Sequence, residues 1–497
     1  MVYDNRMSRR GLLRGFGVAQ LAIGMLFVII GLRAALMPAQ VDTYWHLRAG
    51  ADIWRTGQVP RVESYSFTAA GWPWRDHEWL WQPISYAFYH LGGMPLLTLF
   101  GAALVLATVA LSYRLMIGAA WVRFFLMIAW LPLLPSAWTL RPQLLSLLAV
   151  PLLQTLLVRG RHALIPLLFV VWANVHGAVA LGGVLLGAAT ATALLRWRVY
   201  GAPEDRRRAR ALAVVLPLSG LACLVTPLGT GIFHFLSDSM RRIRAVHIEE
   251  WRSAFAIEQL AISFWIVAAA FVFLLIKRRR ALRDGPASSW AAWVTVACAC
   301  ALLPLAFAAL RNVGPFVLLG VPAASHLIGA GLGTGPAARE APASPSTPAP
   351  PGHPIINVIV LAGMVVAAAG LLFRSYRAPA PELDWHPITD GAIAAVRACP
   401  GPLYNQYDEG GYLLWFVPER PIFVDGRQDP FPLSHILAQL DVQWGRAPYR
   451  PLFDRWGIRC AFLPVGSGTT AALERDGWIT RYRDDRYAVL SAPPAAR

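Results

Sequence analysis

Charged residues are scarce in this sequence. Asp, Glu, Lys and Arg make up 15% of its 497 residues, whereas soluble domains carry about a quarter. This shortage excludes an ordinary soluble enzyme. Hydrophobic residues make up 56% of the chain and gather in blocks of roughly twenty, the length of a helix that crosses a bilayer. The composition therefore predicts a polytopic α-helical membrane protein.

Cysteine is also rare, and several familiar catalytic motifs are missing. Three of the five Cys residues, Cys223, Cys298 and Cys300, lie inside apolar blocks, so neither a disulfide-rich scaffold nor a CxxC metal site is indicated. No HExxH, GxGxxG or P-loop motif occurs, so no zinc-protease or nucleotide site is predicted. A net charge of +17 is typical of nucleic-acid-binding proteins, but the Arg residues cluster between apolar blocks, where they act as topology signals. We therefore expect no nucleic-acid partner.

About eleven apolar segments are predicted to span the membrane. They are residues 15–37, 94–113, 119–136, 142–158, 162–175, 177–195, 211–228, 258–276, 289–309, 312–330 and 354–373. The fifth and sixth, and the ninth and tenth, follow each other so closely that one of these four is alternatively a re-entrant segment. The first lacks a small-residue cleavage site, so it reads as a retained helix with a cytoplasmic N-terminus. Threading from there places the basic clusters 159–161, 196–210 and 277–283 on the cytoplasmic side, as the positive-inside rule requires.

The chain divides by composition into a membrane bundle and a tail. Residues 1–330 form the bundle, including a first outer loop at 38–93. Residues 331–353 are rich in Gly, Ala, Ser and Pro, which predicts a disordered cytoplasmic linker. After the last span, residues 374–497 alternate short apolar strands with helices, which predicts a small extracytoplasmic α/β domain. The expected strands are 402–405, 422–425 and 460–464, and the expected helices are 388–398, 409–417 and 433–441.

Two of the Cys residues, Cys399 and Cys460, lie in this tail. An oxidising outer compartment favours one disulfide between them, closing a loop of about sixty residues. Two separate buried thiols are an equally good interpretation of the sequence.

The first outer loop holds the most informative residues. Residues 43–56 have helical spacing and stop before Gly57 and Pro60, which predicts a helix with Asp42 as its cap and His46 one turn later. A second amphipathic helix is expected to begin near Asp76 and to run through His90.

Ionisable groups at the edge of the membrane tend to mark functional sites. Asp42 there is a candidate general base toward an acceptor hydroxyl or amine, and His46, Asp76, His77 and Glu78 are candidate catalytic neighbours. The alternative is that Asp42 only caps a helix and that the surrounding Trp and Tyr residues only anchor the loop in the interface.

Four strings carry a resemblance: DTYWHLRAGADIWRTGQVP, SYSFTAAGWPWRDHEWL, WANVHG and YNQYDEGGYLLWFVPERPIFVDGR. With the order of helix, long outer loop and many-helix bundle, the chain resembles the GT-C superfamily of polyprenyl-phosphate-sugar-dependent glycosyltransferases. It is most similar to a bacterial family of multi-pass glycosyltransferase-like proteins. The resemblance implies that Asp42 is the outer-loop acidic residue that acts as base or donor-site ligand. Thr43 stands where many relatives have a second acidic residue.

Other polar residues are expected at the outer ends of the spans. The candidates for substrate binding are Arg141, Asn174, His176, Glu249, Glu250 and Arg311. An Arg fork matches phosphate oxygens bidentately, so Arg141 and Arg311 are candidate ligands of a lipid-linked phosphate. The alternative is an Arg that snorkels or pairs within the bundle. No metal-spaced motif occurs, so no metal ligands or cofactor are predicted, and a divalent metal stays an open alternative.

These observations favour a glycosyltransferase of the bacterial inner membrane. It is expected to take its sugar from a polyprenyl-phosphate carrier among the membrane lipids and to give it to an envelope glycan, lipid or protein on the outer face. One alternative is a transporter or flippase of a lipid-linked glycan, which needs polar groups at mid-membrane. Another is a non-catalytic envelope scaffold.

Overall fold

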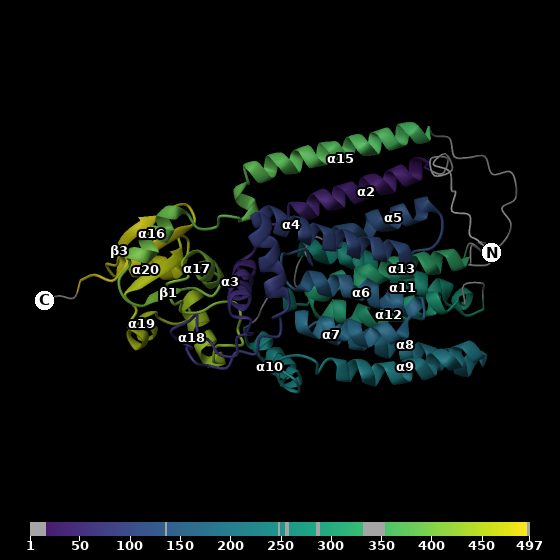
Figure 1. Cartoon of the computed structure of the whole chain (residues 1–497), viewed down its shortest axis with the longest axis horizontal. Helices are drawn as coiled ribbons and strands as arrows, with labels where there is room; N and C mark the ends of the chain where they lie inside the picture. Colours follow the sequence, from purple (N-terminus) through teal and green to yellow (C-terminus); the bar gives the residue numbers. More distant parts are fainter. Residues whose placement is uncertain are drawn as a thin grey trace.

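The molecule has two parts, a long helical bundle and a smaller region with a sheet at one end of it (Figure 1). The computed structural model describes residues 16–134, 137–246, 249–253, 258–284, 289–331 and 353–494. Of the predicted linker, residues 332–352 lie outside this part of the chain.

A helix lies on every one of the eleven predicted spans. These helices are α2 (Val18–Ala35), α4 (Trp81–Leu115), α5 (Ala120–Trp130), α6 (Gln143–Val158), α7 (Ile165–Val175), α8 (Val179–Tyr200), α9 (Pro203–Ala222), α11 (Glu258–Asp284), α12 (Trp290–Ala308), α13 (Val313–Gly331) and α15 (Pro354–Arg377). Among the described residues, six segments are long and apolar enough to cross a membrane: α2, α4, α8, α12, α15 and Leu310–Gly329. Helices α5, α6 and α7 are shorter but apolar, and α9 and α11 each carry a run of Arg at one end.

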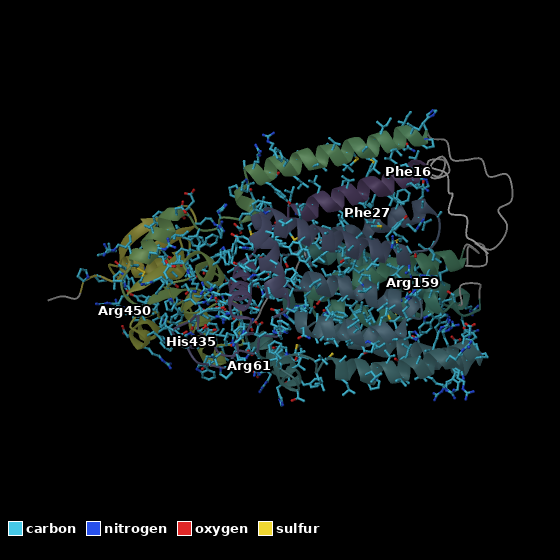
Figure 2. All side chains as sticks on the ribbon, viewed as in Figure 1. Phe16, Phe27, Arg61, Arg159, His435 and Arg450 are labelled. Atoms are coloured by element: carbon cyan, nitrogen blue, oxygen red, sulfur yellow. A yellow bond between two sulfur atoms is a disulfide. The ribbon has the colours of Figure 1, made fainter. Side chains whose placement is uncertain are left out.

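The basic ends of these helices meet at one end of the bundle. The Tyr200 hydroxyl at the end of α8 donates to the Arg283 carbonyl at the end of α11, 2.7 Å away. The indole of Trp290 donates to the Leu157 carbonyl over 2.8 Å, two residues before Arg159. Figure 2 labels Arg159 far along the bundle from His435 and Arg450 in the sheet-containing region. The basic clusters and the sheet therefore lie at opposite ends of the molecule.

The loop between α2 and α4, called the first loop below, contains the predicted helix, α3 (Val41–Thr56). Asp42 does not cap it. Gln40 holds the cap position, and Asp42 lies inside the first turn with its carboxylate turned away to other partners. This prediction was wrong because the helix begins two residues earlier than its apolar spacing indicated.

The second predicted helix also begins elsewhere. Helix α4 starts at Trp81 rather than near Asp76, because the amide of Glu78 donates to the Asp76 carboxylate at 3.3 Å and residues 77–80 form turns. Its helical geometry breaks at Gly92 and Gly93, where Gly93 has a φ of 64°. A left-handed φ favours glycine, so this pair divides α4 into a short first helix and a longer second one.

The C-terminal region, residues 378–494, contains a four-stranded mixed sheet in the order β1-β2-β4-β3. The strands are β1 (Leu403–Asn405), β2 (Cys460–Pro464), β3 (Ile479–Arg483) and β4 (Tyr487–Ser491). Strands β1 and β2 are parallel and the other neighbours are antiparallel. The helices are α16 (Asp390–Ala398), α17 (Gly410–Phe416), α18 (Leu433–Gln443), α19 (Arg450–Trp456) and α20 (Gly468–Arg475). The predicted strands 402–405 and 460–464 and all three predicted helices are confirmed.

The predicted strand at 422–425 was wrong. Its backbone does not join the ladder of the sheet: the Ile422 amide donates to the Tyr65 carbonyl at 3.0 Å, and the Phe67 amide donates to the Ile422 carbonyl at 3.2 Å. Only an isolated bridge to Ser66 results. Strand β1 is hydrogen-bonded to it through the side chain of Asn405, which accepts from the Phe423 amide and donates to the Val424 carbonyl. This apolar segment therefore forms a contact between the C-terminal region and the first loop.

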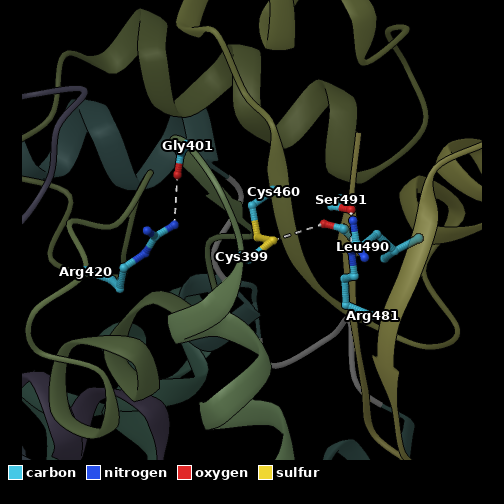
Figure 3. The surroundings of a disulfide bond; sticks show 7 residues. All are labelled: Cys399, Gly401, Arg420, Cys460, Arg481, Leu490 and Ser491. Atoms are coloured by element: carbon cyan, nitrogen blue, oxygen red, sulfur yellow. Dashed lines mark hydrogen bonds between the residues drawn. A yellow bond between two sulfur atoms is a disulfide. The ribbon is translucent and has the colours of Figure 1, made fainter. Parts of the chain in front are cut away.

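A disulfide joins Cys399 and Cys460, with their Cα atoms 5.9 Å apart (Figure 3). Cys399 follows α16 and Cys460 opens the central strand β2. Both residues are buried. The disulfide interpretation of the sequence is thus confirmed over that of two separate thiols.

Short elements complete the described chain. They are the helix α10 (Gly231–Val246) and the 3-10 helices η1 (Leu131–Leu133), η3 (His162–Leu164), η4 (Glu249–Trp251), η6 (Leu310–Asn312) and η7 (Pro381–Leu383). Helix α10 lies beside the C-terminal region at the sheet end of the bundle (Figure 1). The elements η4 and η6 carry the predicted site residues Glu249, Glu250 and Arg311.

Candidate active site

A polar cavity of about 100 Å³ lies where the bundle, the first loop and the C-terminal region meet. Its walls come from α3, from the turns before α4, from the start of α6, from the end of α7 and from the C-terminal region. The lining residues are Asp42, Trp45, His46, Trp74, Arg75, Asp76, His77, Glu78, Arg141, Pro142, Gln143, His176, Gly426, Arg427 and Asp429. The structure therefore brings all five predicted catalytic residues together with Arg141 and His176.

Asp42 projects into this cavity from the first turn of α3. Its Oδ1 accepts a hydrogen bond from the Trp45 indole at 3.0 Å, one helical turn further on. Its Oδ2 lies 3.2 Å from Nε of Arg141. The side chain keeps 21% of its surface exposed, so the carboxylate is held in place and still accessible.

Arg141 lies between two carboxylates. Its Nη1 is 2.8 Å from Glu250 Oε1 in η4, while its Nε holds Asp42. Burial alone lowers the pKa of the guanidinium, but Asp42 and Glu250 outweigh it and raise that pKa. Pro142 follows at the N-cap of α6 and fixes the backbone there. Arg141 is therefore a permanently charged group placed against Asp42.

Glu78 is surrounded by three imidazoles. Its carboxylate oxygens lie 3.7 Å from His46 Nε2, 3.5 Å from His77 Nε2 and 3.7 Å from His176 Nε2. Burial raises the pKa of Glu78 to about 8, against the lowering effect of Arg141. Burial also lowers the pKa of His77 to about 3 and the pKa values of His46 and His176 well below 6.5. At neutral pH the four groups are therefore mainly uncharged.

Asp76 is buried beside this cluster. Its Oδ1 accepts from the side-chain amide of Gln82 at 2.8 Å, whereas Oδ2 has no hydrogen-bond partner among the described residues. Burial raises the pKa of Asp76 to about 7, despite the hydrogen bonds that lower it. Asp76 is thus close to half protonated at neutral pH, whereas Glu78 is mainly protonated.

Arg311, in η6, contacts the side chain of His176. Its Nη2 lies 3.2 Å from His176 Nε2, and its guanidinium is 4.6 Å from the ring centroid of Trp251. Because Nε2 accepts from the guanidinium, the proton of His176 lies on Nδ1, which faces the Ser146 hydroxyl at 2.8 Å. Within the described residues no carboxylate lies within 4.0 Å of Arg311, although its side chain is partly buried.

Asn174 lies apart from the cavity, and its amide is fully used. Its Oδ1 accepts from the Trp79 indole at 2.6 Å, and its Nδ2 donates to the carbonyls of Val170 and Val225. This residue thus ties the turn before α4 to the end of α7. Glu249 opens η4, but its side chain lies outside the described residues.

Several lining residues were missed from the sequence. Arg75 belongs to the first loop, where its amide and Nε donate to the Asp429 carboxylate at 2.6 and 2.9 Å. Arg427 is a buried cation of the C-terminal region that pairs with Glu63 of the first loop at 2.7 Å. The signal available was that both residues lie inside the strings quoted for the family resemblance.

The described residues hold no group of three or more His, Cys, Asp or Glu side chains placed to bind a metal ion. The three imidazoles around Glu78 approach its oxygens no closer than 3.5 Å.

No family model and no curated protein matches the chain. Solved structures do. The archaeal oligosaccharyltransferase AglB from Archaeoglobus fulgidus, in complex with an inhibitory peptide and a dolichol-phosphate, is similar with a TM-score of 0.52 at 10% identity, covering 90% of this chain and 69% of AglB. The oligosaccharyltransferase of that organism in the apo form gives 0.53 at 10% identity, with the same coverages of 90% and 69%.

ArnT from Cupriavidus metallidurans, bound to undecaprenyl phosphate, is similar with a TM-score of 0.48 at 15% identity, covering 96% of this chain and 98% of ArnT. The two oligosaccharyltransferase structures decide the fold, because their TM-scores exceed 0.5. Over about nine tenths of its length, the chain therefore has the GT-C-like fold of these two oligosaccharyltransferase structures.

Proposed function

We propose that this chain is an integral-membrane glycosyltransferase that transfers a sugar from a polyprenyl-phosphate carrier to an acceptor at the outer face of the membrane. The observation that carries the proposal is the Asp42–Arg141 pair, 3.2 Å apart in a polar cavity at one end of the bundle. A nucleophile must be deprotonated and a phosphate must be held in such a reaction, and this pair supplies one group for each task.

Asp42 is the proposed general base. As an acceptor hydroxyl or amine attacks C1 of the sugar, its proton passes to Asp42, the bond from C1 to the phosphate oxygen breaks, and the polyprenyl phosphate leaves with the electron pair. Glu78 is less suited to this task, because a pKa of about 8 keeps its carboxyl group mainly protonated at neutral pH. The hydrogen bond from Trp45 and the contact with Arg141 orient the Asp42 carboxylate.

Arg311 and Arg141 are the proposed phosphate ligands. Arg141 already faces Asp42 and Glu250, whereas Arg311 has no carboxylate within 4.0 Å among the described residues. A partly buried cation without a carboxylate favours an anionic ligand, so Arg311 supplies more of the phosphate affinity. AglB, which shares the fold, was solved with a dolichol-phosphate, which supports a lipid-phosphate donor.

The positive-inside rule supports the orientation. The basic clusters lie at the end of the bundle opposite the cavity, so a cytoplasmic location for them puts the cavity and the C-terminal region outside. No soluble nucleotide-sugar is expected there, which favours a lipid-linked donor in a bacterial inner membrane. The clustering of ionisable groups at one end favours surface chemistry over translocation.

Binding of undecaprenyl phosphate tests the donor class directly. The chain purified in detergent is expected to bind it, and Arg311→Gln is expected to bind at least about tenfold more weakly, since a charge-assisted hydrogen bond contributes about 1.5 to 3 kcal/mol. Arg446→Gln is the matched control, because Arg446 is an exposed Arg of the C-terminal region. Equal binding by both variants and the wild type would remove Arg311 from the phosphate site.

A further inference from the structure

One turn of the C-terminal region reaches the candidate base. Gly426 lines the cavity, and a Cβ atom added to it would lie 2.8 Å from Oδ1 of Asp42. Real Cβ contacts are not that short, so even a methyl group at this position displaces the carboxylate. The next atoms such a Cβ would meet are Asp42 Cγ at 3.9 Å and Tyr407 Cε1 at 4.0 Å. The contact is therefore with Asp42 almost alone.

Gly426 is not required here for its backbone conformation. Its φ lies outside the left-handed region that favours glycine, so an alanine adopts the same backbone without strain. A side chain at position 426 is excluded because Asp42 occupies the space it would need. This makes the position a clean probe of the contact.

A buried ion network fixes the turn in place. Arg427 Nε donates to both oxygens of Asp425, at 2.9 and 3.0 Å, and its Nη2 to Oδ2 at 2.6 Å. Its Nη1 lies 2.7 Å from Glu63 Oε2 in the first loop. The guanidinium also lies over the rings of Trp74 and Tyr65, 4.5 and 4.9 Å from their centroids. The turn is thus anchored to the same loop that carries the catalytic candidates.

Hydrogen bonding from a second segment supports the same turn. The Tyr407 hydroxyl donates to the Gly426 carbonyl at 3.1 Å. A Cβ on Gly410 would collide with the Val424 carbonyl oxygen, and one on Gly411 would collide with the Val41 carbonyl oxygen. The two glycines therefore let α17 approach both the turn and the residue before Asp42.

We infer that the turn around Gly426 is a positioning element for Asp42. Resting on the glycosyltransferase function proposed above, it confines the carboxylate to the orientation that faces Arg141 Nε and the Trp45 indole. The C-terminal region is on this account a permanent wall of the active site. It is not an appendage that only recruits the acceptor.

A double-mutant cycle on stability tests the contact without any substrate. Gly426→Ala is expected to lower the thermal unfolding midpoint of the full-length chain, whereas the same change made in Asp42→Ala is expected to leave the midpoint of that variant unchanged, because the colliding atoms are gone. Asp42→Ser gives a second background if Asp42→Ala fails to fold. Gly466→Ala is the control, since a Cβ there meets nothing within 4 Å and should shift the midpoint equally in every background.

Transfer kinetics give the second readout. In the wild-type background Gly426→Ala is expected to lower kcat at least tenfold while undecaprenyl phosphate binding stays within twofold of wild type. Equal midpoint shifts from Gly426→Ala with and without Asp42 would overturn the inference and leave the proposed function standing. If Gly426→Ala lowers the midpoint only when Asp42 is present, but the wild-type chain transfers no sugar, the proposed function is overturned. The contact between Gly426 and Asp42 would then be structural only.

Discussion

Removing the charge of Arg427 should separate the C-terminal region from the first loop. The side chains of Arg427, Glu63 and Asp425 are all at most 1% exposed. Taking one partner from a buried ion pair leaves an uncompensated buried charge, which costs about 3 to 5 kcal/mol. Arg427→Met keeps the apolar stem and strands two carboxylates at once. We therefore expect the free energy of unfolding to fall by at least about 3 kcal/mol.

An exposed pair of the same region provides the control. Arg486 pairs with Asp384 at 2.7 Å, and these side chains are 44% and 25% exposed. Exposed pairs contribute about 0 to 1 kcal/mol, so Arg486→Met should change the stability little. Adding Glu63→Gln and Asp425→Asn to Arg427→Met removes the stranded charges and should recover much of the loss.

Urea unfolding of the detergent-solubilised chain measures these differences by linear extrapolation. Limited proteolysis of the folded chain reports the same event locally, because a detached first loop becomes cleavable between α3 and α4. A loss from Arg427→Met no larger than that from Arg486→Met would refute the reasoning that this network docks the C-terminal region.

Three further predictions concern the disulfide, the pH dependence and the topology. Replacing Cys399 and Cys460 by Ala opens a loop with a sequence separation of 61 and should cost about 4 kcal/mol of stability, and mass spectrometry of unreduced peptides should find the bridge. Glu78 has a pKa raised from 4.5 to about 8 in the folded chain, so the unfolded state binds fewer protons between these values and stability should fall as pH rises through them, less so in Glu78→Gln. A phosphatase fused after the C-terminal region should be active, and a fluorescent protein there should be dark; the reverse pattern would refute the orientation.

Much of the fold could be predicted because each signal for it is local. A block of about twenty apolar residues already specifies a spanning helix, so all eleven predicted spans fall on helices. That Asp42, Glu78 and Arg141 lie at the same end of the bundle could be predicted from sidedness, since all three follow or precede spans there.

Contacts between distant parts of the chain could not be predicted in this way. Arg427 pairs with Glu63 and Asp429 with Arg75 across more than 350 residues, and no periodicity in either segment records such a pairing. The segment 422–425 was misassigned because its apolar residues are buried between the sheet and the first loop, as those of a strand would be, although its backbone does not join the sheet. Strand β3 was missed because its residues are mostly exposed and include two Arg, which hides the alternation expected of a strand.

Turnover by Asp42→Asn tests the central claim most directly. Asn keeps the size of the side chain and its hydrogen bond from Trp45, but it cannot accept the proton of the acceptor. With undecaprenyl-phosphate-linked sugar as donor in membranes at matched expression, we predict a loss of roughly 100- to 10,000-fold. Asp52→Asn, on the same helix but outside the cavity, should transfer at close to the wild-type rate. An Asp42→Asn chain with wild-type turnover would contradict the assignment of Asp42 as the general base.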